Sequence, residues 1–273
     1  MKQFSLFNDF LYISNYMDNI LEKLNSVFTG LKFNPETHTY TDDYNTKFIS
    51  CTQFTDLFKY KKDWATIRKK YAEKHHIDEA EVKAKWQAAG QYATTLGTEI
   101  HSVMEYLWQG KDYPGNPEVL AKFPDMAEDF IARKKIATDM FKKLSHRFEP
   151  VANEFKVYDR DMKIAGTIDF IAWDKIDKNL VIIDWKSSKK FDKNSFTPGE
   201  MMSYPFNEYQ DCNTNHYSLQ LSVYKYIVEK NTGLKIGKMI LFQLPRAGFM
   251  PESFVCRDMS KELDLLFKTK RNE

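Results

Sequence analysis

The chain has 273 residues, of which 42% are hydrophobic and 15% aromatic, and it carries a net charge of +2. This composition is typical of a folded protein with a packed core and excludes a disordered chain. A charge so close to neutral gives no global indication of a nucleic-acid partner, so such contacts are expected only from local basic patches.

The first third of the chain is predicted to be mainly helical. We expect residues 1–94 to form a helical N-terminal region packed on the core, with a β-hairpin over 31–50 that turns at Asp42 and Asp43. The remainder of this region is assigned to helices over residues 5–28, 52–60, 62–75 and 78–92. The first residues lack a signal-peptide pattern, and no apolar run reaches the ~18–20 residues that cross a bilayer. A cytoplasmic protein without membrane contact is therefore expected.

The core is predicted to span residues 95–273, and its pattern changes after Pro150. Helices are expected first, over residues 95–108 and 116–146, the second with Pro117 at its first position. The elements expected after Pro150 are strands over 151–158, 163–173 and 179–186, a helix over 216–231, a strand over 236–244 and a helix over 259–270. This order predicts an α/β (α+β) fold with a central mixed sheet flanked by helices. The irregular segment 190–215 is long enough to suggest a functional role.

Two acidic residues interrupt apolar runs on adjacent predicted strands. Asp169 lies in AGTIDF and Asp184 in VIIDWKSS, and an unpaired charge in such a run is costly to bury. Lys186 follows Asp184 by two residues, so both side chains lie on one face of their strand. If the two strands pair, two carboxylates and an ammonium meet at one end of a sheet, a plausible site for a hard cation. The D-x-K pattern alone is common, and a solvated strand end is the favoured alternative until other motifs are added.

This set of side chains suits phosphodiester hydrolysis. Mg²⁺ or Mn²⁺ held by carboxylates lowers the pKa of a bound water and polarises a phosphoryl oxygen. A lysine beside the attacking water orients it or stabilises the developing charge. A hydrolase that uses two carboxylates on another substrate, such as a glycoside, is a weaker alternative, because the lysine fits phosphate chemistry better.

Further polar residues occur in an order that supports this hypothesis. His101 and Glu105 share one face of a predicted helix, and the histidine offers a nitrogen ligand better suited to Mn²⁺ than to Mg²⁺. Glu154 lies on the strand before that of Asp169. Gln220 and Tyr224 share one face of the helix after the sheet. Taken singly, these residues are equally compatible with a surface histidine, a charge at a strand edge and an ordinary amphipathic helix.

Together these motifs resemble the RecB-like branch of the PD-(D/E)XK nuclease superfamily, which includes lambda-type exonucleases. The family pattern is G-T-x-x-H-x-x-x-E, a strand glutamate, G-x-x-D, D/E-x-K and Q-x-x-x-Y. The residues that match it, in the family's order, are Gly97, Thr98, His101, Glu105, Glu154, Gly166, Asp169, Asp184, Lys186, Gln220 and Tyr224. The match covers roughly residues 95–230 and implies a restriction-endonuclease-like core of αβββαβ order.

The resemblance implies roles for these residues. Metal ligands would be His101, Asp169 and Asp184, holding one or two Mg²⁺ or Mn²⁺ ions. The residues implied to be catalytic are Asp169, Asp184, Lys186, Glu154, Gln220 and Tyr224. An iron–sulfur cluster, which many bacterial relatives carry, is excluded because the chain has only three cysteines, Cys51, Cys212 and Cys256.

The resemblance also implies a DNA nuclease, more an exonuclease than an endonuclease, acting in DNA recombination, repair or replication. The compact form resembles phage-encoded enzymes, which would act in the host cytoplasm. A recombinase, a single-strand-binding protein or a helicase would be a separate chain, since no GxxxxGK[ST] motif is present. A catalytically silent DNA-binding subunit is the alternative, and the sequence does not indicate the oligomeric state.

Two local patches are candidates for DNA contact. Lys189 and Lys190 follow the strand of Asp184 and are predicted to lie near the scissile phosphate, although plain solvation is equally compatible. Residues 59–74 mix lysine and arginine with Tyr60, Trp64 and Tyr71, a composition suited to phosphates and stacked bases. For that segment an ordinary amphipathic helix is the favoured alternative.

Overall fold

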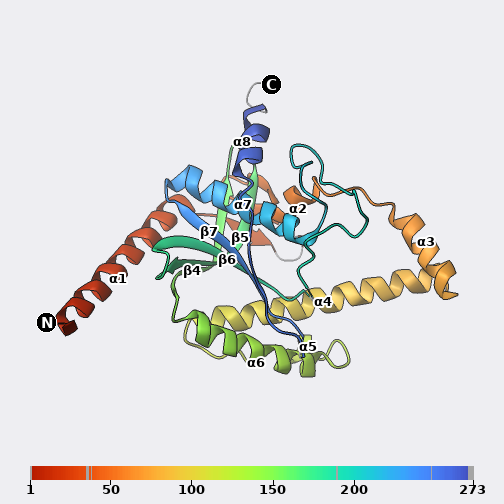
Figure 1. Ribbon diagram of the computed structural model, residues 1–273, viewed down its shortest axis with the longest axis horizontal. Helices are drawn as coiled ribbons and strands as arrows, with labels where there is room; N and C mark the ends of the chain where they lie inside the picture. The colour runs from red at the N-terminus through yellow and green to blue at the C-terminus, as the bar shows by residue number, and fades with distance from the viewer. Residues whose placement is uncertain (1, 35–36, 38, 189, 247, 270–273) are drawn as a thin grey trace.

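The computed structural model describes residues 2–34, 37, 39–188, 190–246 and 248–269, and side chains from residue 15 to 268 within them (Figure 1). A mixed sheet lies at the centre of this part of the chain, as predicted. Its strands are β1 (Lys32–Asn34), β2 (Thr39–Thr41), β3 (Lys47–Ser50), β4 (Phe148–Asp159), β5 (Ile164–Asp174), β6 (Asn179–Lys186), β7 (Ile236–Gln243) and β8 (Ser253–Val255). The helices are α1 (Lys2–Val27), α2 (Cys51–Asp56), α3 (Trp64–His75), α4 (Glu79–Trp108), α5 (Pro117–Leu120), α6 (Met126–Leu144), α7 (Asn213–Thr232) and α8 (Ser260–Thr269).

Three long strands form the centre of the sheet. β4, β5 and β6 make an antiparallel meander, and α7 carries the chain over to β7, which pairs parallel to β6. β5 pairs with β4 along its whole length, so its other edge serves two partners: β3 at Ile164 and Ala165, and β6 from Phe170 onwards. Residues 166–169 lie between these two partners. The interruption leaves Asp169 at the point where β5 and β6 begin to separate.

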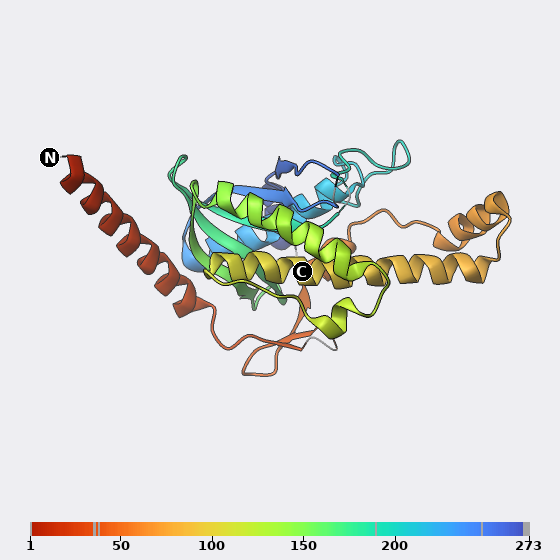
Figure 2. The same cartoon turned by 90° about the horizontal axis from the view of Figure 1, so that it is seen from below.

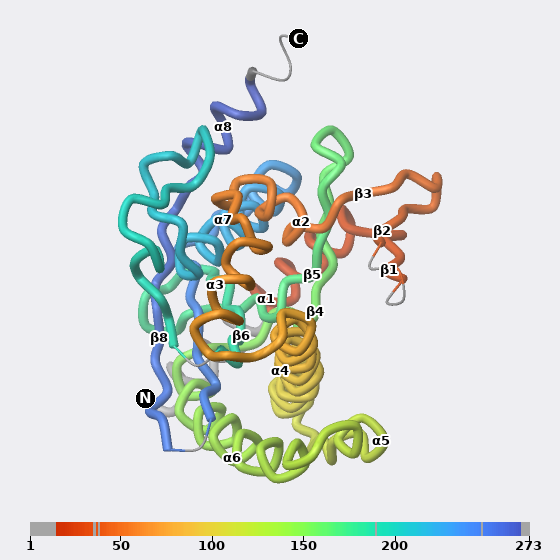
Figure 3. Tube along the Cα trace, turned by 90° about the vertical axis from the view of Figure 1, so that its right-hand side faces the viewer, coloured from red at the N-terminus to blue at the C-terminus, as the bar shows by residue number. Residues whose placement is uncertain are grey.

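Two apolar cores hold the sheet between helical layers (Figure 3). On one face, α4 and α6 pack on side chains of β5, β6 and β7, and this core includes Leu96, Ile100, Val103, Met104, Phe130, Phe170, Ile183 and Trp185. On the other face, α1, α2, α7 and α8 pack on the alternate residues, including Leu24, Phe54, Ile168, Ile182, Leu219, Val223 and Leu263. Burial on both faces explains why the central strands are almost continuously apolar.

Several predicted boundaries were wrong for local reasons. The helices predicted over 78–92 and 95–108 form one helix, α4, because no proline interrupts them and residues from Leu96 onward pack on the sheet. Residues 94 and 95, where the predicted division of the chain falls, lie inside α4, and the division itself stays a prediction. The helix predicted over 116–146 is broken between α5 and α6, where Pro124 cannot donate a hydrogen bond and Asp125 adopts a left-handed φ of 63°.

The segment predicted as a hairpin contains three strands, and the third, β3, joins the main sheet beside β5. β8 was not predicted, because three residues are too short to show an alternating pattern. In the described part of the chain, no helix has the length and apolar character needed to cross a membrane.

The first half of α4 extends beyond the sheet. Figures 1 and 2 show that α3 and the beginning of α4 form a helical hairpin that projects from the body of the molecule. The second half of α4 lies across the sheet, where it supplies residues to the pocket described next.

Candidate active site

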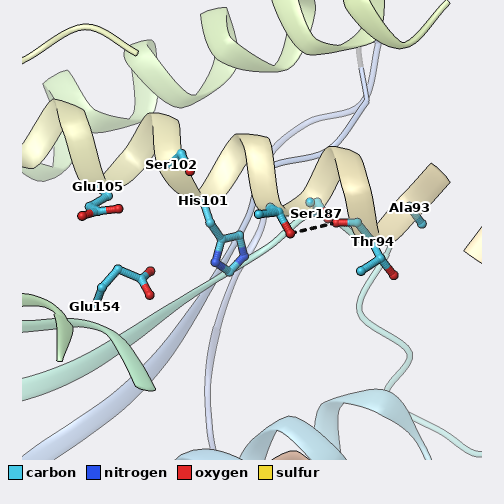
Figure 4. A pocket seen from close by; sticks show the side chains of 9 residues that line it. Ala93, Thr94, His101, Ser102, Glu105, Glu154 and Ser187 are labelled. Carbon is cyan, nitrogen blue, oxygen red and sulfur yellow. Dashed lines mark hydrogen bonds between the residues drawn. The ribbon is translucent and has the colours of Figure 1, made fainter. Parts of the chain in front are cut away.

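A pocket of about 450 Å³ lies between the second half of α4 and the strand β4 (Figure 4). Its lining residues are Ala93, Thr94, Gly97, Thr98, His101, Ser102, Glu105, Glu154 and Ser187. His101 and Glu105 are one helical turn apart on α4, so both side chains face the pocket, as their spacing predicts. Three of the predicted motif regions thus meet here: the helix, the glutamate strand and the end of the D-x-K strand.

His101, Glu154 and Asp169 come together from α4, β4 and β5. Their candidate ligand atoms, one imidazole nitrogen and two carboxylate oxygens, lie within 4.8 Å of one another. His101 Nδ1 is 3.3 Å from Asp169 Oδ2. The same oxygen accepts a hydrogen bond of 2.9 Å from the backbone N–H of Trp185, which holds the carboxylate at the gap between β5 and β6.

Glu154 lies directly opposite Asp169 in the β4–β5 ladder, between the pairs Asn153–Phe170 and Phe155–Ile168. Its φ of 46° is in the left-handed region, which a residue with a side chain seldom adopts in a strand. Burial and the carboxylates of Asp169, Glu105 and Asp184 raise the pKa of Glu154 to about 8. The strained backbone and the crowded charge both indicate a residue held in place by its surroundings.

Asp184 and Lys186 form a buried ion pair on β6. The ammonium lies 2.7 Å from Asp184 Oδ2 and donates to Oδ1 over 2.9 Å, and the carboxylate is only 3% exposed. Burial raises the pKa of Asp184, an effect that Lys186 opposes. Burial alone lowers the pKa of Lys186, but Asp184 and Asp169 more than compensate and raise it. Lys186 is therefore positively charged at neutral pH.

Asp184 lies outside the group of ligand atoms formed by His101, Glu154 and Asp169. Its Oδ2 atom is buried and accepts no hydrogen bond from the described residues, so its one close partner is the Lys186 ammonium. The predicted ligand set of His101, Asp169 and Asp184 stays a prediction. In the structure, the donor atoms that lie close together belong to His101, Asp169 and Glu154.

Gln220 and Tyr224 lie on α7, and the Tyr224 ring packs against β5 at Gly166. Gln220 donates a hydrogen bond of 3.3 Å to the Tyr224 hydroxyl, and burial raises the pKa of that buried hydroxyl. A Cβ on Gly166 would lie 2.6 Å from the Tyr224 ring, so the glycine allows the ring to approach the strand. The structure thus connects the G-x-x-D and Q-x-x-x-Y motifs through packing, whereas their catalytic role stays a prediction.

Lys189 and Lys190, the two lysines predicted to contact DNA, follow the D-x-K strand. Lys189 falls outside the described residues. The ammonium of Lys190 is 2.7 Å from Asp192, and its side chain is 77% exposed. It lines a separate cavity formed with the following loop, and its contact with DNA stays a prediction.

Two residues that the sequence did not indicate support the D-x-K strand. The Lys186 ammonium lies 4.6 Å from the centre of the Tyr217 ring, a cation–π contact from α7. Tyr217 precedes Gln220 by three residues on the same helix, and this spacing could have indicated that both face the site. Arg133 on α6 is buried and donates to the carbonyl oxygens of Ser187 and Leu244 over 2.9 and 3.2 Å, which fixes the chain just after Lys186. Arg133 also pairs with Asp129 four residues earlier, but the two carbonyls it supports are distant in sequence, so no local pattern could have indicated this role.

A family model described as the PD-(D/E)XK nuclease superfamily matches residues 70–268. The chain belongs to this superfamily. The assignment of Asp169, Asp184 and Lys186 to the two acids and the lysine of the PD-(D/E)XK pattern stays a prediction. No curated protein matches the chain. Among solved structures, the crystal structure of SSO0001 is 13% identical, with a TM-score of 0.30, and the alignment covers 96% of this chain and 87% of that one.

The residues of this PD-(D/E)XK site fit a divalent cation. Three carboxylates and an imidazole crowd around the pocket, and burial together with the neighbouring carboxylates raises the pKa of Glu154, a repulsion that a bound cation would relieve. The carboxylate of Asp184, which contacts the Lys186 ammonium through both oxygens, is a further candidate ligand. Oxygen-rich sites with one nitrogen suit Mg²⁺ or Mn²⁺.

Glu154 should make the metal-free protein less stable as the pH rises. Its pKa of about 8 in the folded protein lies above the usual value of 4.5, so the folded state holds a proton that the unfolded state releases. The stabilisation is complete below pH 4.5 and is lost as the pH rises through 8. In EDTA, we expect the Tm to fall between about pH 4.5 and pH 8 and to level off above it, and Glu154→Gln should flatten this decline. Thermal unfolding at each pH provides the measurement.

Glu149→Gln is the matched control, since Glu149 is on the same strand and pairs with Lys175 at the surface. That variant should keep the wild-type pH profile. Mg²⁺ or Mn²⁺ should raise the Tm of the wild type more at about pH 9 than at pH 6, because a cation must displace the Glu154 proton at the lower pH. Equal pH profiles for the wild type and Glu154→Gln would contradict the assignment of this titration to Glu154.

Proposed function

We propose that this protein is a metal-dependent deoxyribonuclease that hydrolyses phosphodiester bonds from DNA ends. The observation that supports it most is the meeting of His101, Glu154 and Asp169 within 4.8 Å, with the Asp184–Lys186 pair on the adjoining strand. Asp169, Asp184 and Lys186, which are proposed to be the acids and the lysine of the superfamily pattern, lie on the adjoining strands β5 and β6. A member that had lost catalysis would be expected to lack one of them.

Different residues of the site would have different roles in the reaction. His101, Glu154, Asp169 and Asp184 would hold one or two Mg²⁺ or Mn²⁺ ions, which supply charge to polarise the phosphate and to activate a water molecule. The Lys186 ammonium, oriented by Asp184 and the Tyr217 ring, stabilises negative charge that develops on the phosphate oxygens.

The preference for DNA ends, and a role in recombination, repair or replication, rests on the order of the motifs. The sequence GTEIH at 97–101, followed by Glu154, Asp169, Asp184 and Lys186, matches the RecB-like branch, whose members mainly process ends. A viral source and a partner recombinase, single-strand-binding protein or helicase belong to the same proposal.

Cleavage of end-labelled linear DNA and of closed circular DNA tests this function directly. With Mg²⁺ or Mn²⁺, we expect progressive loss of the label from linear DNA and no cut in the circle, and EDTA should stop the reaction. Cleavage of the circle at a rate similar to linear DNA would indicate an endonuclease. Binding of linear and single-stranded DNA without any cleavage would instead indicate a catalytically silent DNA-binding subunit.

A further inference from the structure

A helical hairpin extends from the active-site helix and carries a larger net positive charge than the whole chain. We define this arm as residues 59–92, which comprise the segment before α3, α3 itself and the first half of α4 (Figure 2). The arm has 9 lysines and arginines and 5 acidic residues, a net charge of +4, whereas the whole chain has +2. The remainder of the protein is thus slightly acidic, and a polyanion would meet its strongest attraction at the arm.

Much of this charge is free to meet a ligand. Arg68 pairs with Glu79 and Lys85 with Glu81 across and along the hairpin. By contrast, no described residue forms an ion pair with three exposed lysines of α3, namely Lys69, Lys70 and Lys74. Helical spacing places Lys70 and Lys74 on one face.

The arm also exposes aromatic rings that a typical helical hairpin would bury. Trp64 and Tyr71 pack edge-on against Trp86 of α4, with ring centres 6.4 and 5.5 Å apart, yet Trp64 is 59% and Tyr71 40% exposed. Tyr60 at the base of the arm is 47% exposed. The Tyr71 ring also contacts the His75 ring, with centres 4.2 Å apart, so Trp64 is the more accessible of the two for stacking on an unpaired base.

The position of the arm relative to the pocket is fixed. One helix joins them, since α4 begins in the arm at Glu79 and lines the pocket from Ala93. Fourteen residues of helix separate these two points, a distance of about 20 Å. The base of the arm is also tied to the loop that follows Lys186: the Tyr60 N–H donates to Asp211 over 2.6 Å, and Lys62 pairs with Glu200 at 3.2 Å.

We propose that the arm is a second nucleic-acid-binding surface, which holds a single strand outside the catalytic pocket, through Lys69, Lys70, Lys74 and the exposed rings of Trp64 and Tyr71. That the bound strand is a substrate of this protein rests on the proposed function. The charge and the aromatic rings that carry it, however, lie outside the catalytic pocket. Binding can therefore be tested without catalysis.

The test is fluorescence anisotropy with a labelled oligothymidine of about 30 nucleotides in EDTA, where cleavage does not interfere. Lys69→Glu with Lys70→Glu should weaken binding by about tenfold or more, and Trp64→Ala by about tenfold. For Lys69→Ala with Lys70→Ala, the slope of log K against log salt should fall by about 1.4, or ~0.7 for each lost phosphate contact. Circular dichroism and thermal unfolding show that each variant keeps its fold.

Lys235→Glu with Lys261→Glu is the matched control, because it reverses two exposed charges outside the arm. It should leave binding unchanged. Equal losses in the control and the arm variant, unchanged binding in the arm variants, or no binding by the wild type would each overturn the proposal. So would a change of oligomeric state in the arm variants without loss of binding, which would indicate a protein contact. Cleavage is measured separately. A protein that binds the strand through its arm but does not cleave DNA would contradict the proposed nuclease activity and leave the binding role of the arm intact.

Discussion

Replacing Lys186 by methionine is expected to reduce DNA cleavage by about 10³-fold. Methionine keeps most of the length of the side chain but removes the charge that lies 2.7 Å from Asp184 and 4.6 Å from the centre of the Tyr217 ring. Asp184→Asn should cause a similar loss, because it removes both a ligand position and the orientation of the lysine. Single-turnover cleavage of linear DNA at saturating protein gives the chemical rate without the contribution of binding.

Stability separates a chemical effect from a folding effect. Either single variant leaves one buried charge unpaired, at a cost of about 3–5 kcal/mol, whereas the double variant Asp184→Asn with Lys186→Met removes both charges and should recover most of that loss. Lys143→Met, at an exposed position near the end of α6, is the control and should change neither rate nor stability. A decrease of less than about tenfold for both single variants would show that the reaction does not depend on this pair.

Gly166→Ala should destabilise the protein by about 1–3 kcal/mol, because the added methyl group overpacks a filled site. The new Cβ would lie 2.6 Å from Cε1 and 2.9 Å from the hydroxyl of Tyr224, and 3.1 Å from the sulfur of Cys51. These atoms are buried, so the ring can move only by disturbing α7. Since Asp169 is three residues further along β5, we expect cleavage to fall as well.

Gly90→Ala makes the same chemical change where space is open. Gly90 lies in the part of α4 that extends from the body, and among the described residues no neighbouring atom lies within 4 Å of the position that the added methyl group would take. Alanine is favoured over glycine in a helix by about 1 kcal/mol, so this variant should raise stability. Thermal unfolding should thus give Tm shifts of opposite sign for the two variants, of about 2–4 °C for each kcal/mol. A Gly166→Ala protein as stable as the wild type would mean that Tyr224 is not held against β5.

Much of the core was predictable because its signals are local. Strands β5 and β6 were predicted to within one residue of their observed ends, since their apolar runs are bounded by polar turns. Helix boundaries were less accurate. The junction near residue 94 contains glycine and threonines that are poor helix formers, but tertiary packing of the residues from Leu96 onward extends the helix through it. Local propensity is a weak effect beside such burial.

The superfamily could be recognised from the order of the motifs alone. The shared face of Asp184 and Lys186 was also predictable, because residues two apart on a strand point to the same side. By contrast, three contacts could be known only from the folded chain: Glu154 opposite Asp169, Tyr217 on Lys186, and Arg133 on the chain after Lys186. These contacts depend on strand register and on how helices dock against the sheet. Both depend on the burial of many apolar residues that are distant in sequence, so a short motif cannot predict them.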